Sequence, residues 1–422
     1  MDKVSFVIIG LGGRGHDIYG KYALKHPDEV EITAIADPRE DRLKIMQEEH
    51  HVPVDRCFKT GEELLSSPKL GDVAVIATQD QQHVAQAVLA MQKGYHLLLE
   101  KPIAIDIEGC REVLEAARKY KRHVTVCHVL RYAPFYETLK KIIDDGRIGK
   151  VVAIQAMEQV GYWHFVHSYV RGNWRRADTS SPMILAKCCH DMDILIWLSG
   201  SRAKRVSSYG NLFNFKRENA PEGSADRCLD CQVRHQCPYD AVKFYIEAER
   251  SGVAHGHVNW PVNVLNPHPT VESITKALRE GPYGKCAYKT DNDVADHQAV
   301  NIELETGATI NFTVSAFTED CYRTIKVMGT TGCVEGNMDT NVLTWHSFQG
   351  ESEEIDINAE EGPLAGHGGG DDVMVRRFVE KLKNDDGSEM LSTIEASVES
   401  HIVALLAEES RLDGGKSLDV IL

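Results

Sequence analysis

The stretch VSFVIIGLGGRG, residues 4–15, decides the fold of the first part of the chain. It joins an apolar run, typical of a buried strand, to the turn Gly10-x-Gly12-x-x-Gly15, and a helical pattern follows. Such a turn requires glycine because the backbone bends tightly and must approach a pyrophosphate closely. The anion then lies at a helix N-terminus, where N–H groups and the helix dipole favour it. The pattern predicts a dinucleotide-binding turn; a glycine turn without a ligand is the alternative.

An acidic residue stands where the second strand is expected to end. Asp37 closes the run EITAIAD, about 20 residues beyond the glycine turn, and a carboxylate there accepts hydrogen bonds from the ribose hydroxyls of NAD. Arg39 follows two residues later, and an arginine there would instead bind the 2′-phosphate of NADP. Because a carboxylate repels that phosphate, we expect NAD and keep NADP as the alternative.

Strand-like runs and helical stretches alternate from residue 1 to 128. The later runs are EITAIAD (31–37), VAVIAT (73–78), HLLLEKP (96–102) and HVTVCH (123–128). Helical patterns, such as those over 41–50 and 82–94, separate them. Continuous apolar strands joined by helices indicate a parallel sheet covered on both faces. We predict a doubly wound α/β Rossmann domain over residues 1–128.

The pattern changes after residue 128. Helical and alternating strand patterns are found at 132–145, 151–159, 181–198, 300–317, 371–383 and 392–412. The stretch Glu305-Thr306-Gly307 is predicted to form the turn of a hairpin. Long antiparallel strands with helices on one face predict an α+β domain over 129–422. An irregular segment at about 219–288, rich in Cys, His and Pro, is predicted to be an insertion.

The composition excludes several classes of partner. The 422 residues include 47 basic and 63 acidic side chains, a net charge of −16, and such a surface repels nucleic acid and anionic membranes. No apolar run has the length of a membrane span, and the N-terminus shows no signal-peptide pattern. Most of the 11 cysteines stand singly, as in a reduced cytosolic protein. We expect a cytoplasmic protein that binds a small molecule, and neither nucleic acid nor membrane.

Two sets of polar residues are candidates for a catalytic role. Lys101, in Glu100-Lys101-Pro102, follows a strand at the carboxyl edge of the sheet, where ligands bind in such folds. There it would bind or polarise a substrate oxygen, or act as a base, and a cis bond before Pro102 would aim it. In the helix predicted over 181–198, Lys187, His190 and Asp191 share one face, and a histidine beside lysines exchanges protons near neutral pH. A surface lysine and a solvated helix face are the alternatives.

Two further stretches are candidates for substrate binding. The stretch GYWHFVHSYVRGNW (161–174) contains side chains suited to a sugar, namely Tyr162, His164, His167 and Trp174. The loop GHGGGDD (366–372) places His367 and Asp371 among glycines before a helix. Ordinary packing is the alternative for the first stretch, and a loop with a helix cap is the alternative for the second.

The insertion contains the segment CLDCQVRHQCP, with Cys228, Cys231 and Cys237. An insertion with little core gains stability from a structural zinc ion, which needs four thiolate or imidazole ligands. His235, His257 or Cys286 would supply the fourth ligand, and free thiols are the alternative. A metal here is expected to be structural, because no water-activating carboxylates accompany it.

An ordered set of motifs resembles the Gfo/Idh/MocA oxidoreductase family from end to end. The matching features are the glycine turn, Ala77-Thr78, Glu100-Lys101-Pro102, Arg131-Tyr132-x-Pro134, His190-Asp191 and the stretch AEES (407–410). The resemblance implies a second domain with a large open, mainly antiparallel sheet, often used for oligomerisation, so we expect a homodimer or homotetramer. It also places the cofactor against Gly10, Gly12, Gly13, Arg14, Gly15, Asp37, Arg39, Thr78, Gln79, His83, Glu100 and Lys101.

The resemblance also implies the reaction, dehydrogenation of a sugar, an inositol or a related polyol. Lys101 matches the family's catalytic lysine and His190 its acid/base histidine. Many members have an aspartate four residues before that histidine, but here the residue is Ala186. We therefore nominate Lys187 as a third catalytic residue, and Asp191 and His367 join the expected substrate site. Two alternatives stay open: a redox-neutral, NAD-dependent glycosidase that uses the same residues, and a non-catalytic nucleotide-binding regulator.

Overall fold

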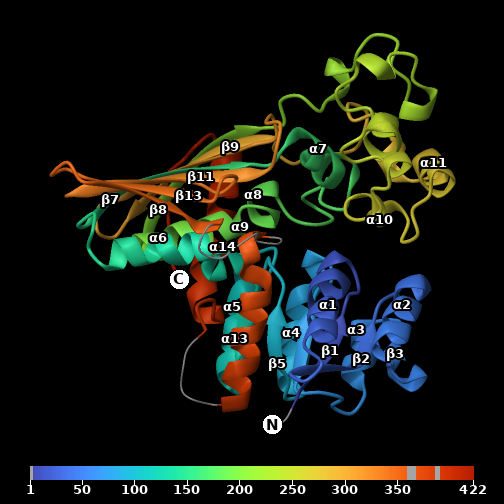
Figure 1. Cartoon of the computed structure of the whole chain (residues 1–422), viewed down its shortest axis with the longest axis horizontal. Helices are drawn as coiled ribbons and strands as arrows, with labels where there is room; N and C mark the ends of the chain where they lie inside the picture. Colours follow the sequence, from blue (N-terminus) through green and yellow to red (C-terminus); the bar gives the residue numbers. More distant parts are fainter. Residues whose placement is uncertain (1–2, 359–366, 385–389) are drawn as a thin grey trace.

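The computed structural model describes residues 3–358, 367–384 and 390–422. Two sheets, each with its own set of helices, dominate the structure, and the insertion stands beside them (Figure 1). In the described residues, no helix combines the length and the apolar character needed to cross a membrane.

The first sheet is the predicted Rossmann sheet. Its order is β3-β2-β1-β4-β5-β6, and all neighbouring strands are parallel. The strands are β1 (Val4–Ile9), β2 (Val30–Ala36), β3 (Cys57–Phe58), β4 (Val73–Ile76), β5 (His96–Leu99) and β6 (Val124–Val126). The two-residue strand β3 was not among the predicted ones, because so short a run has no periodicity to read.

Apolar side chains leave both faces of this sheet, as the continuous apolar runs predict. Along β1, Phe6 and Ile8 belong to one buried cluster and Val7 and Ile9 to another. The helices of this domain are α1 (Lys21–Lys25), α2 (Glu40–His50), α3 (Gly61–Ser66), α4 (His83–Gln92) and α5 (Ile107–Tyr120). The glycine turn continues into a wider π-helical segment, Gly13–Gly20, before α1 begins.

The second sheet has nine strands in the order β14-β13-β12-β11-β7-β10-β9-β8-β15. Only β7 and β10 run parallel, so the predicted mainly antiparallel sheet and the hairpin turn at 305–307 are confirmed. The strands are β7 (Val151–Gln159), β8 (Ala203–Asn211), β9 (His297–Leu304), β10 (Thr309–Ser315), β11 (Tyr322–Gly329), β12 (Gly332–Asn337), β13 (Val342–Ser347), β14 (Ser352–Asp356) and β15 (Leu418–Asp419).

Helices α6 (Pro134–Asp144), α9 (Cys189–Ser199) and α14 (Ile394–Leu412) lie against one face of this sheet (Figure 1). The opposite face carries none of the helices drawn in Figure 1, and homo-oligomerisation through it stays a prediction. Helix α13 (Gly370–Asn384) packs on the Rossmann sheet instead, with Phe378 in the same cluster as Phe6.

Helix α14 belongs to both cores. Its residues Ile394, Val398 and Ile402 pack with the Rossmann cluster of Val7, and its residue Val403 packs in the core of the second domain. The two domains therefore share a helix at the place where their functional residues meet.

The irregular segment leaves the second sheet after β8 and returns at β9. Within it the structure forms α10 (Val262–Leu265), α11 (Val271–Glu280) and several 3-10 turns. A separate small cluster, which includes Tyr245, Ile274 and Leu278, is its only core among the described residues. The insertion thus depends on few apolar contacts of its own.

A buried ion pair ties the turn that follows the Rossmann sheet to helix α9 of the second domain. Arg131, in a 3-10 turn after β6, donates two hydrogen bonds of 2.6 and 2.7 Å to Asp193 of α9 and one of 2.6 Å to the carbonyl oxygen of Leu391. Removing one partner leaves the other charge buried without compensation.

We predict that Asp193→Ala lowers the free energy of unfolding by about 3–5 kcal/mol, because it leaves the Arg131 charge unpaired. Urea-induced unfolding followed by circular dichroism measures the change. Asp419→Ala is the matched control, since its pair with Arg205 lies on the surface, and it should leave stability almost unchanged. Equal stability of the two variants would contradict the assigned role of the buried pair.

Candidate active site

The glycine turn has the conformation that a closely bound ligand requires. Gly10 has a φ of +91°, and a Cβ on it would lie 2.4 Å from the carbonyl oxygen of Ala77. A Cβ on Gly15 would lie 1.9 Å from the carbonyl oxygen of Gly10. At Gly12 and Gly13, by contrast, the nearest atoms are 3.6 and 3.8 Å away. Gly10 and Gly15 therefore close the turn, whereas Gly12 and Gly13 leave its backbone open to a ligand.

Asp37 braces this turn from the end of β2. Its carboxylate accepts hydrogen bonds from the backbone N–H groups of Leu11 at 2.7 Å and Arg39 at 2.9 Å. The Arg39 guanidinium is directed to Asp41, with which it forms a surface pair of 2.5 Å. Arg42, which the sequence analysis did not name, lies 3.7 Å from Asp37. The guanidinium group that pairs with the Asp37 carboxylate is therefore that of Arg42 and not that of Arg39.

Hydrogen bonds from buried side chains fix the loop that follows β4. Buried His83 places Nδ1 2.6 Å from the carbonyl oxygen of Pro102 and Nε2 3.2 Å from that of Thr78. The Thr78 hydroxyl donates to Gln86 at 2.8 Å, and Gln79 follows it in the loop. The side chains of Thr78 and His83 thus position the loop, and cofactor contact by these three residues stays a prediction.

Arg14, inside the glycine turn, links the turn to both domains. It lies 2.6 Å from Glu100, at the end of β5, and 2.7 Å from Asp371, at the start of α13. Asp371 in turn lies 2.9 Å from Nδ1 of His367. Burial alone would raise the pKa of Asp371, but Arg14 and the hydrogen bond from His367 outweigh it and hold that pKa well below its usual range. Desolvation lowers the pKa of His367, although 36% of its side chain is exposed, and Asp371 only partly offsets this.

The prediction of one continuous helix before and after His190 is wrong. The segment forms two helices, α8 (Met183–Ala186) and α9, with Lys187 and Cys188 between them. The backbone leaves helical geometry at Cys188, with φ −96° and ψ 6°, and the thiols of Cys188 and Cys189 are both buried in the core. A turn in place of a helical step therefore separates Lys187 from His190.

Lys101 reaches this break from the Rossmann domain. Its Nζ donates a hydrogen bond of 2.8 Å to the carbonyl oxygen of Ala186, the last residue of α8. The Lys101-Pro102 peptide is cis. Behind it, Nε2 of His401 on α14 accepts a 3.0 Å hydrogen bond from the backbone N–H of Ile103. The structure thus brings Lys101 to the pair of helices that carries His190, as the sequence analysis expected.

Lys187 and Asp191 meet a buried ion network and not open solvent. Lys187 Nζ lies 3.0 Å from Glu158 of β7, and Arg323 of β11 lies 2.9 Å from Glu158 and 2.8 Å from Asp191. The sequence analysis did not identify Glu158 or Arg323. A charged residue within an otherwise alternating strand was the available signal, but nothing in the sequence pairs β7 with β11 or with α9.

His190 is nearly enclosed, with 4% of its surface exposed. Its ring centroid lies 5.8 Å from that of His128 and 5.7 Å from that of His367. Burial lowers the pKa of His190 well below its ordinary value, and the nearby charge of Lys101 acts in the same direction. Nδ1 has no hydrogen-bond partner among the described residues. A neutral imidazole with an unused nitrogen can accept a proton from a bound hydroxyl group.

The aromatic residues of the segment 161–174 lie in different parts of the structure. His164 lies 3.5 Å from the thiol of Cys321, and burial, with Lys187 as the second cause, lowers its pKa well below the ordinary value. Trp174 donates to Asp80 of the Rossmann domain at 3.2 Å. Trp174 therefore lies at the junction of the domains, whereas the His164 ring lies 5.0 Å from that of Trp260 in the insertion.

The other two members of that segment contact the insertion. His167 Nδ1 lies 2.6 Å from the hydroxyl of Tyr245, inside the small core of the insertion. Tyr162 has its ring 6.3 Å from that of Tyr239. For His167, packing, the alternative stated above, describes the structure better than a sugar site.

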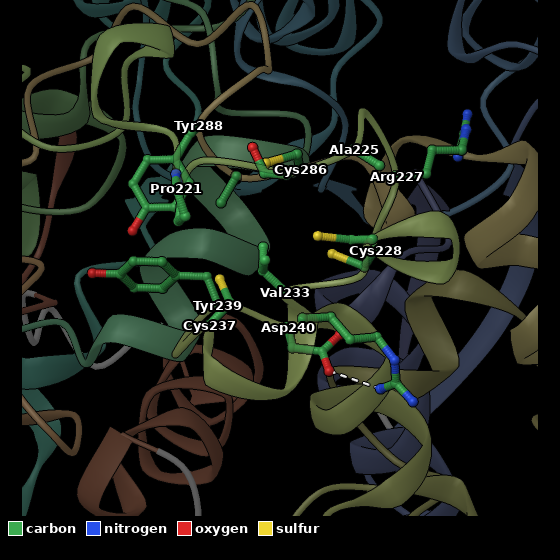
Figure 2. A pocket seen from close by; sticks show the side chains of 14 residues that line it. Pro221, Ala225, Arg227, Cys228, Val233, Cys237, Tyr239, Asp240, Cys286 and Tyr288 are labelled. Carbon is green, nitrogen blue, oxygen red and sulfur yellow. Dashed lines mark hydrogen bonds and ion pairs between the residues drawn. The ribbon is translucent and has the colours of Figure 1, made fainter.

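The three cysteines of the segment CLDCQVRHQCP line one cavity, and Cys286, near the end of the insertion, lines it too (Figure 2). The four are Cys228, Cys231, Cys237 and Cys286. His235 and His257 do not line it. Within the described part of the chain, no three His, Cys, Asp or Glu side chains form a ready-made group that could hold a metal ion. The predicted zinc site therefore stays a prediction.

A Rossmann domain with this glycine turn, whose lysine meets a second, mainly antiparallel domain next to a buried histidine, is typical of a class of dinucleotide-dependent enzymes. Comparison with family models agrees. The model described as "Oxidoreductase family, NAD-binding Rossmann fold" matches residues 4–128. The model described as "Oxidoreductase family, C-terminal alpha/beta domain" matches residues 140–416. The chain belongs to the Gfo/Idh/MocA family of NAD-binding oxidoreductases.

Individual relatives are distant. The putative oxidoreductase YteT of Bacillus subtilis (strain 168) is 24% identical over 393 residues, which cover 88% of this chain and 87% of YteT. Inositol 2-dehydrogenase of Corynebacterium glutamicum (strain R) is 26% identical over 200 residues, and the match covers 47% of this chain and 55% of that enzyme. The chain thus matches only about half the length of that dehydrogenase.

Solved structures confirm the fold. An inositol dehydrogenase homologue from Azotobacter vinelandii, complexed with NAD+, superimposes with a TM-score of 0.71 at 16% identity. The superposition covers 99% of this chain and 97% of the other. At this identity the likeness shows the shared fold and nothing about the substrate.

We predict that Lys101→Met raises the pKa of His190, because it removes a positive charge that disfavours the imidazolium. Burial, the larger cause, remains, so the pKa stays below its ordinary value. NMR titration of 13C-labelled histidines measures the shift, with His190→Asn to assign the signal. Lys93→Met, at an exposed position, is the control and should leave the pKa unchanged. An unchanged or lower pKa in Lys101→Met would show that the two groups do not interact as described.

Proposed function

We propose that this oxidoreductase is an NAD-dependent dehydrogenase of the CH–OH group of a sugar, an inositol or a related polyol. The observation that carries the proposal is the hydrogen bond from Lys101 to Ala186, which joins the end of β5 to the helices that bear His190. Dinucleotides bind at the carboxyl ends of parallel strands in this fold. An ammonium group and a neutral imidazole are therefore held together at the edge where the reaction would take place.

The proposed roles follow from the charges of these groups. NAD, when bound, supplies the hydride acceptor. The Lys101 ammonium donates a hydrogen bond to the substrate oxygen and stabilises the negative charge that develops as its proton leaves. His190 is neutral at physiological pH and accepts that proton. The carbonyl oxygen of Ala186, at the position where many family members have an aspartate, keeps Lys101 aimed at this site.

Further side chains would orient the substrate. Lys187, fixed by Glu158, offers ammonium hydrogens to a hydroxyl or carbonyl oxygen. His367, oriented by Asp371, offers a second imidazole 5.7 Å from the ring of His190. Hydroxyl-rich substrates suit such a set, because each hydroxyl both donates and accepts hydrogen bonds. Trp174, at the junction of the domains, and His164 and Tyr162, beside the insertion, would line the sugar site.

Two observations support the substrate class and the cofactor. Inositol 2-dehydrogenase is among the relatives, which fits a polyol substrate. Asp37, braced against the glycine turn, disfavours a 2′-phosphate and so fits NAD better than NADP. The cysteine cavity of the insertion takes no part in the proposed reaction, since its lining includes neither Lys101 nor His190.

The test is an activity assay with a panel of sugars and inositols, run with NAD and separately with NADP. Formation of reduced nicotinamide is monitored by its near-ultraviolet absorbance. Aryl glycosides are assayed in parallel for aglycone release. We expect steady formation of reduced nicotinamide with one or a few polyols, and faster with NAD. Aglycone release without net reduction of the cofactor would overturn the dehydrogenase and establish the redox-neutral glycosidase.

A further inference from the structure

We propose that Cys228, Cys231, Cys237 and Cys286 bind one zinc ion that ties the two ends of the insertion together. The four thiols belong to two segments 49 or more residues apart in sequence, yet all four line a single cavity (Figure 2). The volume of that cavity is about 20 Å³, which is room for one water-sized sphere and not for an organic ligand. Tetrahedral zinc requires four donors of this kind, and the cavity is lined by four cysteines.

The backbone around the cavity holds Cys286 beside the other cysteines. The N–H of Cys286 donates to the carbonyl oxygen of Asp226 at 2.8 Å, and Arg227 pairs with Lys285 in an isolated antiparallel bridge. The start and the end of the insertion thus run side by side at this point. The structure therefore selects Cys286 as the fourth ligand over His235 and His257, neither of which lines the cavity.

A buried arginine lies next to the four cysteines and has no negatively charged partner in the described residues. Arg171 is 2% exposed, and its guanidinium lies 3.5 Å from the sulfur of Cys228. Its other hydrogen bonds go to the carbonyl oxygens of Lys285 and Tyr239, and no carboxylate in the described residues pairs with it. A buried guanidinium without an anion is costly. A metal-bound thiolate at Cys228 would supply the missing charge.

Metal binding at this cavity needs a local rearrangement of the cysteine side chains. Because no three ligands in the described chain are already arranged around an ion, binding requires the thiols to rotate inward about their Cα–Cβ bonds.

The local structure explains what the metal would add. The segment from 217 to 237 contains only 3-10 turns, and the insertion has one small apolar cluster. A structural zinc ion supplies folding free energy where a core is too small to do so. Four thiolates and Zn²⁺ carry a net charge of −2. Arg171 and Arg227, which form no ion pair in the described residues, lie beside the cavity and offset it, whereas Arg234 is already paired with Asp240 and Glu247.

The test is metal content of the full-length protein, measured by mass spectrometry after purification without chelators and after reloading with Zn²⁺. We expect about one zinc ion per chain in the wild type. Cys231→Ser and Cys286→Ser should each lose most of it. Cys333→Ser, on β12 in the second sheet, is the matched control and should retain it.

A second readout does not depend on the folding of the variants. Cobalt-loaded wild-type protein should show the intense visible and charge-transfer absorption of a tetrahedral thiolate site, and this should disappear when Zn²⁺ is added. Wild-type protein that stays metal-free after Zn²⁺ loading, with four thiols that alkylate freely, would overturn the proposal. Full zinc retention in Cys286→Ser, iron in place of zinc, or a disulfide among the four cysteines would overturn it as well.

Discussion

The ion pairs of Arg14 are the constraint on which the site depends. Arg14 lies inside the glycine turn, yet it holds Glu100 at the end of β5 and Asp371 at the start of α13. One guanidinium therefore fixes the phosphate-binding turn, the strand that leads to Lys101 and the helix that orients His367. Planar, permanently charged arginine suits such a double pairing better than lysine would.

The second domain contributes His190, the proposed proton acceptor, and the partner that holds Lys101 in place. The interruption between α8 and α9 gives Lys101 a carbonyl partner at Ala186, so the chain keeps its lysine in place without the aspartate that many family members use. Helix α14 supports the same loop through His401. Because α14 also packs in both cores, the domains are coupled where the reacting groups meet.

Local sequence was enough to predict the Rossmann sheet and the glycine turn with Asp37. Those features depend on short-range patterns: apolar runs, glycines and the residues that directly follow strands. The resemblance to the family, and no local pattern, placed Lys101 and His190 in one site. The roles of Glu158 and Arg323 could not be predicted, since they depend on β7 pairing with β11, which are far apart in the chain. The break at Cys188 was missed for a related reason, because helical periodicity continues through it and only core packing reveals it.

The most direct test of the central claim is a single turnover on bound cofactor. Protein saturated with NAD is mixed with its polyol substrate, and formation of reduced nicotinamide is followed for wild type, His190→Asn and Lys101→Met. NAD affinity is measured for each by calorimetry. We predict that both variants transfer hydride about 10²–10⁴-fold more slowly than the wild type, while His190→Asn binds NAD nearly as well. A variant that binds NAD and transfers hydride at the wild-type rate would contradict this prediction.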